Sequence, residues 1–230
     1  MTMIESIFAG HKCRLYGSEA PGVLLVQPSA RHENGTLEAE AAQIASLAPV
    51  PYLLVTIELD DWTIDLMPWP DGNISRDPEA GKHGQETLAF ILEDLIPELE
   101  QRYGALPVIL GGYSLGGLFA LWASCQTDRF CAVAAASPSV WIHGWLPFAK
   151  KNRPMADAIY LSLGDREEHV KNQAIARVGD NLRAYYDLIQ KQLPPECSTL
   201  VWEEGGHFNE NAGRVARAFA WCMSATAYPA

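Results

Sequence analysis

Basic residues are scarce in this sequence, and they form no extended cluster. Lysine and arginine together number 17 against 28 aspartates and glutamates, which gives a net charge of −11. The longest basic stretch is residues 150–153, Lys-Lys-Asn-Arg. Proteins that bind nucleic acid or anionic membranes usually have the opposite balance. We therefore expect neither partner.

Long apolar runs and paired cysteines are also missing. No stretch reaches the roughly 18 apolar residues that a membrane span needs, and residues 1–5 lack the basic and apolar segments of a secretory leader. The cysteines are odd in number and have no C-x-x-C spacing. We expect a soluble, cytoplasmic protein whose thiols stay reduced, namely Cys13, Cys125, Cys131, Cys197 and Cys222.

Several sequence motifs that define other enzyme classes are absent. The sequence contains no H-E-x-x-H, no paired C-x-x-C, no P-loop and no G-x-G-x-x-G. No motif in the sequence therefore indicates a metal hydrolase, a nucleotide-binding protein or a dinucleotide-dependent enzyme.

What the sequence does have is an alternation of strand-like and helix-like segments. Its 230 residues and 48% hydrophobic content favour a single domain over residues 1–230. An opening hairpin is expected at 3–8 and 12–16, followed by buried strands at 23–27, 51–59, 107–111, 131–136, 159–163 and 199–202.

Helices are expected between these strands. Apolar residues recur every three or four positions over 88–103 and 178–193, and Pro97 should kink or restart the first of these helices. Strands alternating with helices predict an α/β fold in which helices cover both faces of a mostly parallel sheet. Eight strands that open with a hairpin fit the α/β-hydrolase fold, without a large cap domain.

Residues 112–116 have the G-x-S-x-G pattern of a nucleophile elbow. In this turn a serine stands between a strand and a helix, where close neighbours must be glycines. An apolar strand-like run precedes the pattern, and the helix-forming run 118–123 follows it. The pattern alone can arise by chance, as a glycine-rich connection with an incidental serine. Its flanks favour Ser114 as a nucleophile.

A serine nucleophile needs a base, and a histidine is the usual one. In this fold the partners follow in the order serine, acid, histidine, each after a later strand. His207 follows the last expected strand, whereas His169 is more typical of a solvated helix start. The acid is expected after strand 159–163, where counting from Gly164 favours Glu167. Asp165 is the main competitor, and Glu168 is the third choice because it suits a helix start.

The oxyanion formed in acyl transfer needs backbone N–H donors. Leu115, directly after the nucleophile, is expected to supply one. The second should come from the loop after strand 23–27. Because Pro28 has no N–H, Ser29 or Ala30 is the candidate.

The chain resembles the putative esterase family over about residues 22–222. The resemblance lies in the elbow, the acid segment after Gly164, the runs 61–70 and 137–141, and the Gly-Gly-His-Phe of 205–208. This family includes esterase D, feruloyl esterases and enterochelin-type siderophore esterases. The resemblance implies a serine carboxylic-ester hydrolase with no metal or organic cofactor, acting on a small-molecule ester through Ser114, Glu167 and His207.

The resemblance also implies a substrate pocket. The loop around Asp65 and Trp69, the segment around Trp141, and Tyr113 beside the nucleophile are expected to line it. Trp69 and Trp141 could equally be plugs at the end of the sheet. The arginine associated with the positions before Asp65 is absent, which weakens the case for an anionic or catecholate substrate.

Other functions are compatible with this sequence pattern. An acyltransferase or a thioesterase uses the same nucleophile and base, so sequence does not separate them from a hydrolase. A non-catalytic binding protein would keep the fold but hold the triad out of register. The oligomeric state is left open.

Overall fold

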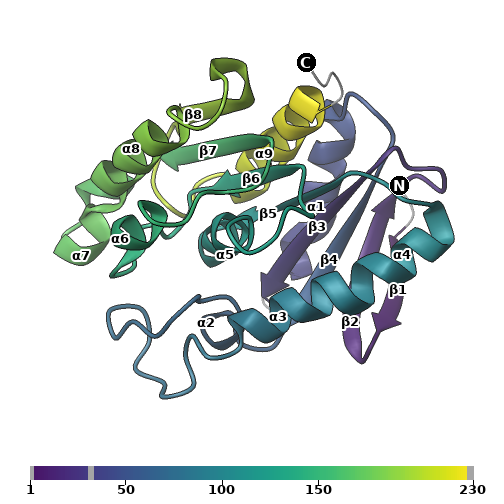
Figure 1. Cartoon of the computed structure of the whole chain (residues 1–230), viewed down its shortest axis with the longest axis horizontal. Helices are drawn as coiled ribbons and strands as arrows, with labels where there is room; N and C mark the ends of the chain where they lie inside the picture. The colour runs from purple at the N-terminus through teal and green to yellow at the C-terminus, as the bar shows by residue number, and fades with distance from the viewer. Residues whose placement is uncertain (1–2, 31–33, 227–230) are drawn as a thin grey trace.

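A computed structural model describes residues 3–30 and 34–226, and one eight-stranded sheet organises them (Figure 1). The strands lie in the order β1-β2-β4-β3-β5-β6-β7-β8. Their bounds are β1 Met3–Phe8, β2 His11–Gly17, β3 Val23–Ala30, β4 Tyr52–Leu59, β5 Val108–Tyr113, β6 Ala132–Ala136, β7 Ala158–Gly164 and β8 Ser198–Glu203.

Strand direction divides the sheet into two parts. β1 and β2 form an antiparallel hairpin, and β2 pairs antiparallel with β4. The remaining pairs, from β4–β3 to β7–β8, are all parallel. The predicted α/β-hydrolase fold and its opening hairpin are confirmed.

Helices occupy the connections between the strands. They are α1 Asn34–Leu47, α2 Trp62–Asp65, α3 Gly84–Phe90, the π-helix η2 Ile91–Leu95, α4 Ile96–Tyr103, α5 Leu115–Ala123, α6 Trp145–Ala149, the 3₁₀ helix η3 Glu167–His169, α7 Gln173–Ala176, α8 Val178–Ile189, η4 Pro195–Cys197 and α9 Asn211–Thr226. Pro97 lies in the first turn of α4, where its missing N–H is tolerated. The backbone stays helical from α3 to α4 through the π-helical turn η2, so the chain does not leave the helix at Pro97.

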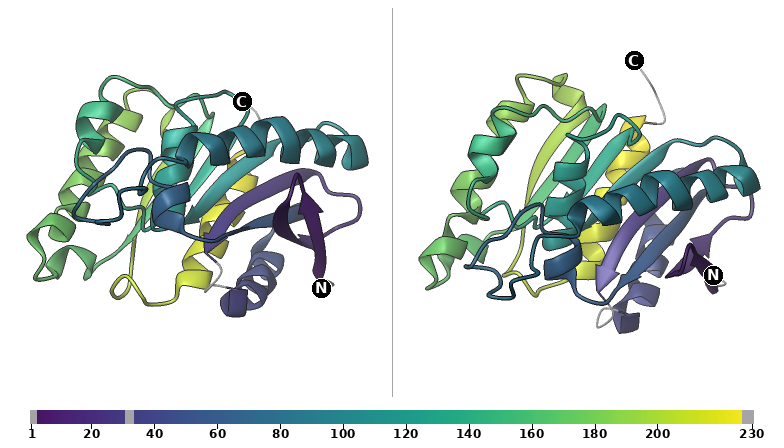
Figure 2. Two further views of the ribbon diagram at one scale, coloured as in Figure 1. Left: turned by 90° about the horizontal axis from the view of Figure 1, so that it is seen from below. Right: turned by 60° about the horizontal axis from the view of Figure 1, so that its bottom comes forward.

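The helices cover both faces of the sheet and define two apolar cores. Helices α1 and α9 pack on one face through residues such as Ile44 and Phe219. Helices α3, α4, α5 and α8 pack on the other, with Leu99, Leu118 and Leu182 buried. Figure 2 shows α9 across the sheet from α3 and α4. Because both faces of the sheet are covered, the central strands β5, β6 and β7 are buried along their whole length and largely apolar, which explains why their sequences do not alternate.

Strand β3 extends three residues beyond the predicted end at Gln27. In the structure Pro28 pairs in register with Ile57 of β4, while pairing with β5 stops at Val26. The N–H of Leu24 donates to the carbonyl of Pro107, on the β5 side. Alternate residues of a strand direct their N–H groups to the same side, so Pro28 also faces the β5 side, where β3 has no partner beyond Val26.

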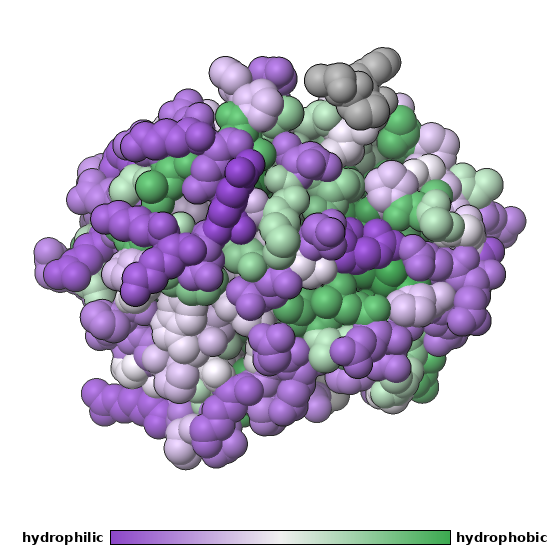
Figure 3. All heavy atoms as spheres, in the orientation of Figure 1, coloured by the Kyte–Doolittle hydropathy of each residue, from purple (hydrophilic) through white to green (hydrophobic). Residues whose placement is uncertain are grey.

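The face drawn in Figure 3 is largely hydrophilic, with a hydrophobic region near its centre. Within residues 3–30 and 34–226, no helix combines the length and the apolar character needed to cross a bilayer.

Candidate active site

Ser114 stands at the turn between β5 and α5, at the carboxyl edge of the parallel strands. Its backbone has φ 54° and ψ −113°, a region that residues with a Cβ rarely adopt. The turn is tight, because a Cβ added to Gly112 would lie 2.9 Å from the carbonyl carbon of Gly116. The fold therefore holds Ser114 in a strained conformation, as the elbow pattern predicts.

Ser114, His207 and Glu167 form one hydrogen-bonded chain. His207 Nε2 lies 3.0 Å from Ser114 Oγ, and His207 Nδ1 lies 2.6 Å from Glu167 Oε2. These residues come from the ends of β5, β7 and β8, which are brought together because parallel strands end at the same edge. The nucleophile, base and acid predicted from the sequence thus lie within hydrogen-bond reach of each other.

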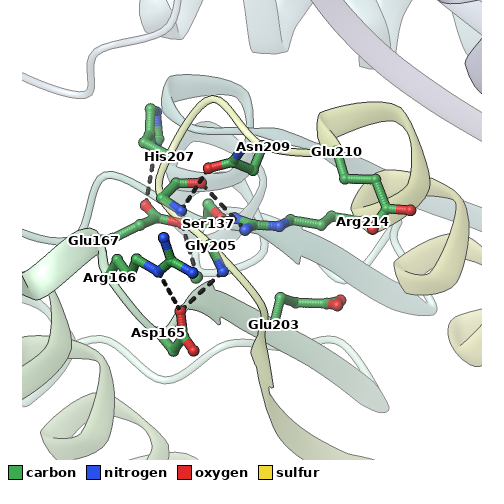
Figure 4. A network of polar contacts seen from close by, with 12 residues as sticks. Ser137, Asp165, Arg166, Glu167, Glu203, Gly205, His207, Asn209, Glu210 and Arg214 are labelled. Carbon is green, nitrogen blue, oxygen red and sulfur yellow. Dashed lines mark hydrogen bonds and ion pairs between the residues drawn. The ribbon is translucent and has the colours of Figure 1, made fainter.

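Glu167 is buried, with 4% of its surface exposed. Its Oε1 accepts from Ser137 Oγ at 2.7 Å, from Gly164 N at 2.8 Å and from Arg214 Nη1 at 2.8 Å (Figure 4). Burial alone raises the pKa of Glu167, but the hydrogen bond and charge of His207, followed by the Ser137 and Gly164 bonds, bring that pKa below its ordinary value. The carboxyl group is therefore ionised while it faces His207.

The other two candidate acids lie elsewhere. Asp165 is turned away from His207 in Figure 4, and its Oδ1 accepts from Gly205 N at 2.9 Å. Glu168 receives two hydrogen bonds from Arg183, at 2.7 and 2.8 Å. Neither side chain belongs to the hydrogen-bonded chain that joins Ser114, His207 and Glu167.

Glu167 also links the pH to the free energy of unfolding. Its folded pKa lies below the ordinary value of 4.5, so its contribution is fully present above about pH 4.5 and is lost as the pH falls through the folded pKa. We expect wild type to be more stable than Glu167→Gln at pH 7 and the difference to shrink below pH 4.5. Urea unfolding of both proteins at several pH values measures this, and a difference that grows towards acid would contradict it.

The predicted oxyanion donors lie at the start of α5 and at the end of β3. The N–H of Leu115 opens α5, where the first-turn N–H groups have no intrahelical acceptor. Ser29 is paired inside β3, and its hydroxyl donates to Ile57 O. Strand alternation turns the N–H of Ser29 towards β4 and that of Ala30 towards the β5 side, where the elbow lies. The geometry therefore favours Ala30 over Ser29 as the second donor.

Two cavities meet at Ser114, His207 and Phe208. The smaller, about 180 Å³, is lined chiefly by apolar side chains that include Trp141. The larger, about 480 Å³, lies on the α1 and α9 side and includes Tyr113. Two of the predicted pocket residues, Trp141 and Tyr113, thus border the site.

The other two predicted pocket residues do not line either cavity. Asp65 borders a separate cavity and faces His83, at 3.7 Å between Oδ1 and Nδ1. Trp69 packs on Phe148, and its Nε1 donates to His143 O at 2.7 Å. Trp69 therefore fastens the loop that contains it to the segment after β6. This is the role of a side chain that covers the end of the sheet, the alternative to a pocket wall.

The model of the putative esterase family matches residues 22–193, most of the chain. The chain belongs to this family. It is a serine esterase of the α/β-hydrolase superfamily, and the matched span includes Ser114 and Glu167, whereas His207 lies beyond it. No curated protein matches the sequence.

Solved structures similar to this esterase share its fold at low sequence identity. The siderophore hydrolase EstA from Aspergillus nidulans is 22% identical with a TM-score of 0.74, and the match covers 96% of this chain and 94% of that one. EstB from the same organism is 18% identical with a TM-score of 0.75, covering 100% and 97%. The enterobactin esterase FES from Shigella flexneri is 17% identical with a TM-score of 0.68, covering 97% of this chain and 59% of its own.

Sequence reasoning missed the residue that anchors the acid of this esterase. Arg214 of α9 is completely buried, and besides Glu167 it donates to Ser137 Oγ at 3.0 Å and to the carbonyls of Glu204 and Gly206 at 3.1 and 3.2 Å. It thus holds both the acid and the loop that carries His207. Its spacing with Ala218 and Cys222 places it on the buried face of α9, and this spacing is the signal that could have revealed it.

Tyr113 was predicted only as a pocket residue, but it also contacts the histidine loop. Its hydroxyl donates to the carbonyl of His207, and burial raises the pKa of that hydroxyl to about 12. Tyr113 therefore stays neutral and fixes the backbone next to the base. In the described ranges no group of three or more His, Cys, Asp or Glu side chains is arranged to hold a metal ion.

Proposed function

We propose that this esterase hydrolyses small or medium carboxylic esters through a Ser114–His207–Glu167 triad and an acyl-enzyme. The observation that carries the proposal is the chain of hydrogen bonds of 3.0 and 2.6 Å that joins Ser114 to Glu167 through the ring of His207. A separation of 3.0 Å between Nε2 and Oγ favours an enzyme over a non-catalytic binding protein.

The proposed reaction has two halves. Ser114 Oγ attacks the ester carbonyl while its proton passes to His207 Nε2, and the oxyanion is met by the N–H of Leu115 and by a second backbone N–H from the end of β3. His207 then gives that proton to the leaving alkoxide oxygen as the C–O bond of the ester breaks. A water molecule attacks the acyl-enzyme by the same route, which releases the acid and restores Ser114. Glu167 stays ionised throughout and orients the ring of His207.

The substrate belongs to the proposal as well. EstA and EstB are named siderophore hydrolases, so siderophore esters are one class to include in a substrate screen. Neither cavity beside Ser114 has a lysine or arginine among its described lining residues, which favours uncharged esters.

A covalent probe tests the role of Ser114 directly. A fluorophosphonate should add once per molecule, at Ser114, because the neighbouring base makes this hydroxyl far more nucleophilic than an ordinary serine. Intact-mass and peptide mass spectrometry measure the adduct and its position. Labelling at another serine, or none at all, would overturn the proposed nucleophile.

Product analysis separates the hydrolase from the acyltransferase and thioesterase alternatives. With an ester substrate and rising concentrations of an added alcohol, a hydrolase should keep releasing the free acid as the main product. Accumulation of the transferred ester would identify a transferase, and faster turnover of the matching thioester would favour a thioesterase.

A further inference from the structure

The larger cavity beside Ser114 contains a buried amide whose hydrogen bonding is incomplete. Gln27 of β3 lines this cavity and is only 4% exposed, and its Oε1 has no hydrogen-bond partner within the described structure. Leaving a buried polar group unpaired costs about 1–3 kcal/mol. Since such groups are rare in native proteins, this one calls for a functional explanation.

A second amide in the lining of this cavity has the same deficit. Asn211, at the start of α9, lines the cavity, and its Oδ1 also has no partner among the described residues. Gln27 and Asn211 come from elements far apart in the sequence. Both amides thus line the space beside Ser114, and their unpaired oxygens are buried in its wall.

The described lining of the cavity is acidic. Glu40 and Glu210 contribute carboxylates to its lining, and its described lining residues include no lysine or arginine. Arg217 pairs with Glu210 at 3.1 Å from outside this lining. The hydroxyl donor of Tyr113 is already used by the carbonyl of His207. The lining thus offers acceptors to a bound group and opposes a bound anion.

The smaller cavity has the opposite character. Its walls include Trp141, Val170, Ile175 and Val178, and its volume is about 180 Å³ against about 480 Å³ for the larger one. An apolar acyl chain fits such a lining. The larger cavity is then left for the alcohol half of the ester.

We propose that the larger cavity is a subsite for an uncharged alcohol rich in hydroxyl groups, and that Gln27 and Asn211 accept hydrogen bonds from those hydroxyls. This inference rests on the proposed ester hydrolysis. Rotation about the last side-chain torsion of Gln27, which is broad for an amide, turns Oε1 towards the bound alcohol. The substrates are accordingly carboxylic esters of polyols, and an alcohol without donors leaves the acceptors unpaired.

Three butyrate esters test the subsite while the acyl group stays constant. They carry 2,3-dihydroxypropyl, 2-methylbutyl, in which methyl groups replace the hydroxyls, and anionic carboxymethyl. With rates normalised to alkaline hydrolysis, wild type should favour dihydroxypropyl over 2-methylbutyl in kcat/KM by about tenfold. Carboxymethyl should be the poorest substrate. Equal rates on the first two esters, or a preference for the anion, would overturn the subsite.

The variant Gln27→Met removes the acceptor and keeps the length of the side chain. We expect its kcat/KM for the dihydroxypropyl ester to fall, so that the preference for this ester over 2-methylbutyl butyrate decreases to about twofold. Its melting temperature should not fall, because the replaced oxygen has no partner to lose. An equal loss on both esters, or a preference that stays at wild-type level, would contradict a role of Gln27 in recognition.

Gln192→Met is the matched control. Gln192 lies after α8, away from both cavities at Ser114, and its Oε1 also has no partner in the described structure. This control should keep the wild-type preference. If Gln27→Met does not fold, Asn211→Ala and the wild-type comparison decide the question.

Hydrolysis of p-nitrophenyl butyrate separates the two proposals. Activity on this ester without a polyol preference overturns the subsite alone. If wild type hydrolyses no ester, the proposed function fails. Ligand-observed NMR with Ser114→Ala then tests the cavity itself, because this variant should bind dihydroxypropyl butyrate more tightly than 2-methylbutyl butyrate. Equal binding would overturn the subsite.

Discussion

Ser114→Ala is expected to lower kcat for p-nitrophenyl butyrate by about 10⁶-fold, with KM little changed. The variant keeps the cavities, His207 and the backbone donors, but it has no atom to form the acyl-enzyme. Any remaining rate reflects water activated by His207 and a bound substrate that is still polarised. Steady-state kinetics with active-site titration measures the loss. Rates equal to wild type would remove Ser114 as the nucleophile.

Ser124→Ala is the control for this loss. Ser124 is also buried, at the C-terminal end of the same helix, and its hydroxyl only donates to Leu121 O. Its replacement should leave kcat within about twofold, because the hydroxyl contacts no group of the triad.

Ser114→Gly separates strain from chemistry. Glycine adopts the observed φ of 54° without the penalty that a Cβ brings, whereas alanine retains that penalty. Ser114→Gly should therefore be as inactive as Ser114→Ala but more stable by about 1 kcal/mol. Equal stability of the two variants in urea unfolding would show that the turn stores no strain at this residue.

The central strands were predictable because they are largely apolar and buried. Both faces of the sheet are covered, so each parallel strand forms a short continuous apolar run between turn residues. The predicted ends differ from the structure by at most three residues. The largest difference is at β3, where Pro28 continues a strand because its missing N–H faces a side without a partner.

The order of Ser114, Glu167 and His207 could be predicted because each follows a separate strand of one parallel sheet. The cavity walls depend instead on how long connections fold. Asp65 and Trp69 lie in a loop that Trp69 fastens to His143, and no local pattern indicates that distant partner. Connections of this kind are fixed by tertiary contacts rather than by local propensity.

Arg214→Met is expected to lower the free energy of unfolding by about 3–5 kcal/mol at pH 7. The variant leaves the carboxylate of Glu167 buried without its ion-pair partner, and Glu204 and Gly206 lose a donor. We also expect kcat to fall, because the acid and the His207 loop are no longer held. Urea unfolding and ester hydrolysis on the same preparations measure both effects.

Arg217→Met is the matched control on the same helix. Arg217 is partly exposed and forms ion pairs with Glu203 and Glu210 at the surface. Exposed pairs of this type contribute about 0–1 kcal/mol, so this variant should stay within that range of wild type and keep its activity. A loss as large as that of Arg214→Met would mean that burial does not distinguish the two arginines.

A double-mutant cycle shows whether the cost of Arg214→Met comes from the charge of Glu167. In the Glu167→Gln background no buried carboxylate is left unpaired, so Arg214→Met should cost several kcal/mol less there than in wild type. Low pH should act like Glu167→Gln, because protonation removes the same charge. An Arg214→Met cost that is identical in both backgrounds would assign the arginine to the loop carbonyls of Glu204 and Gly206 alone. Its effect on catalysis would then come from the placement of His207 rather than of the acid.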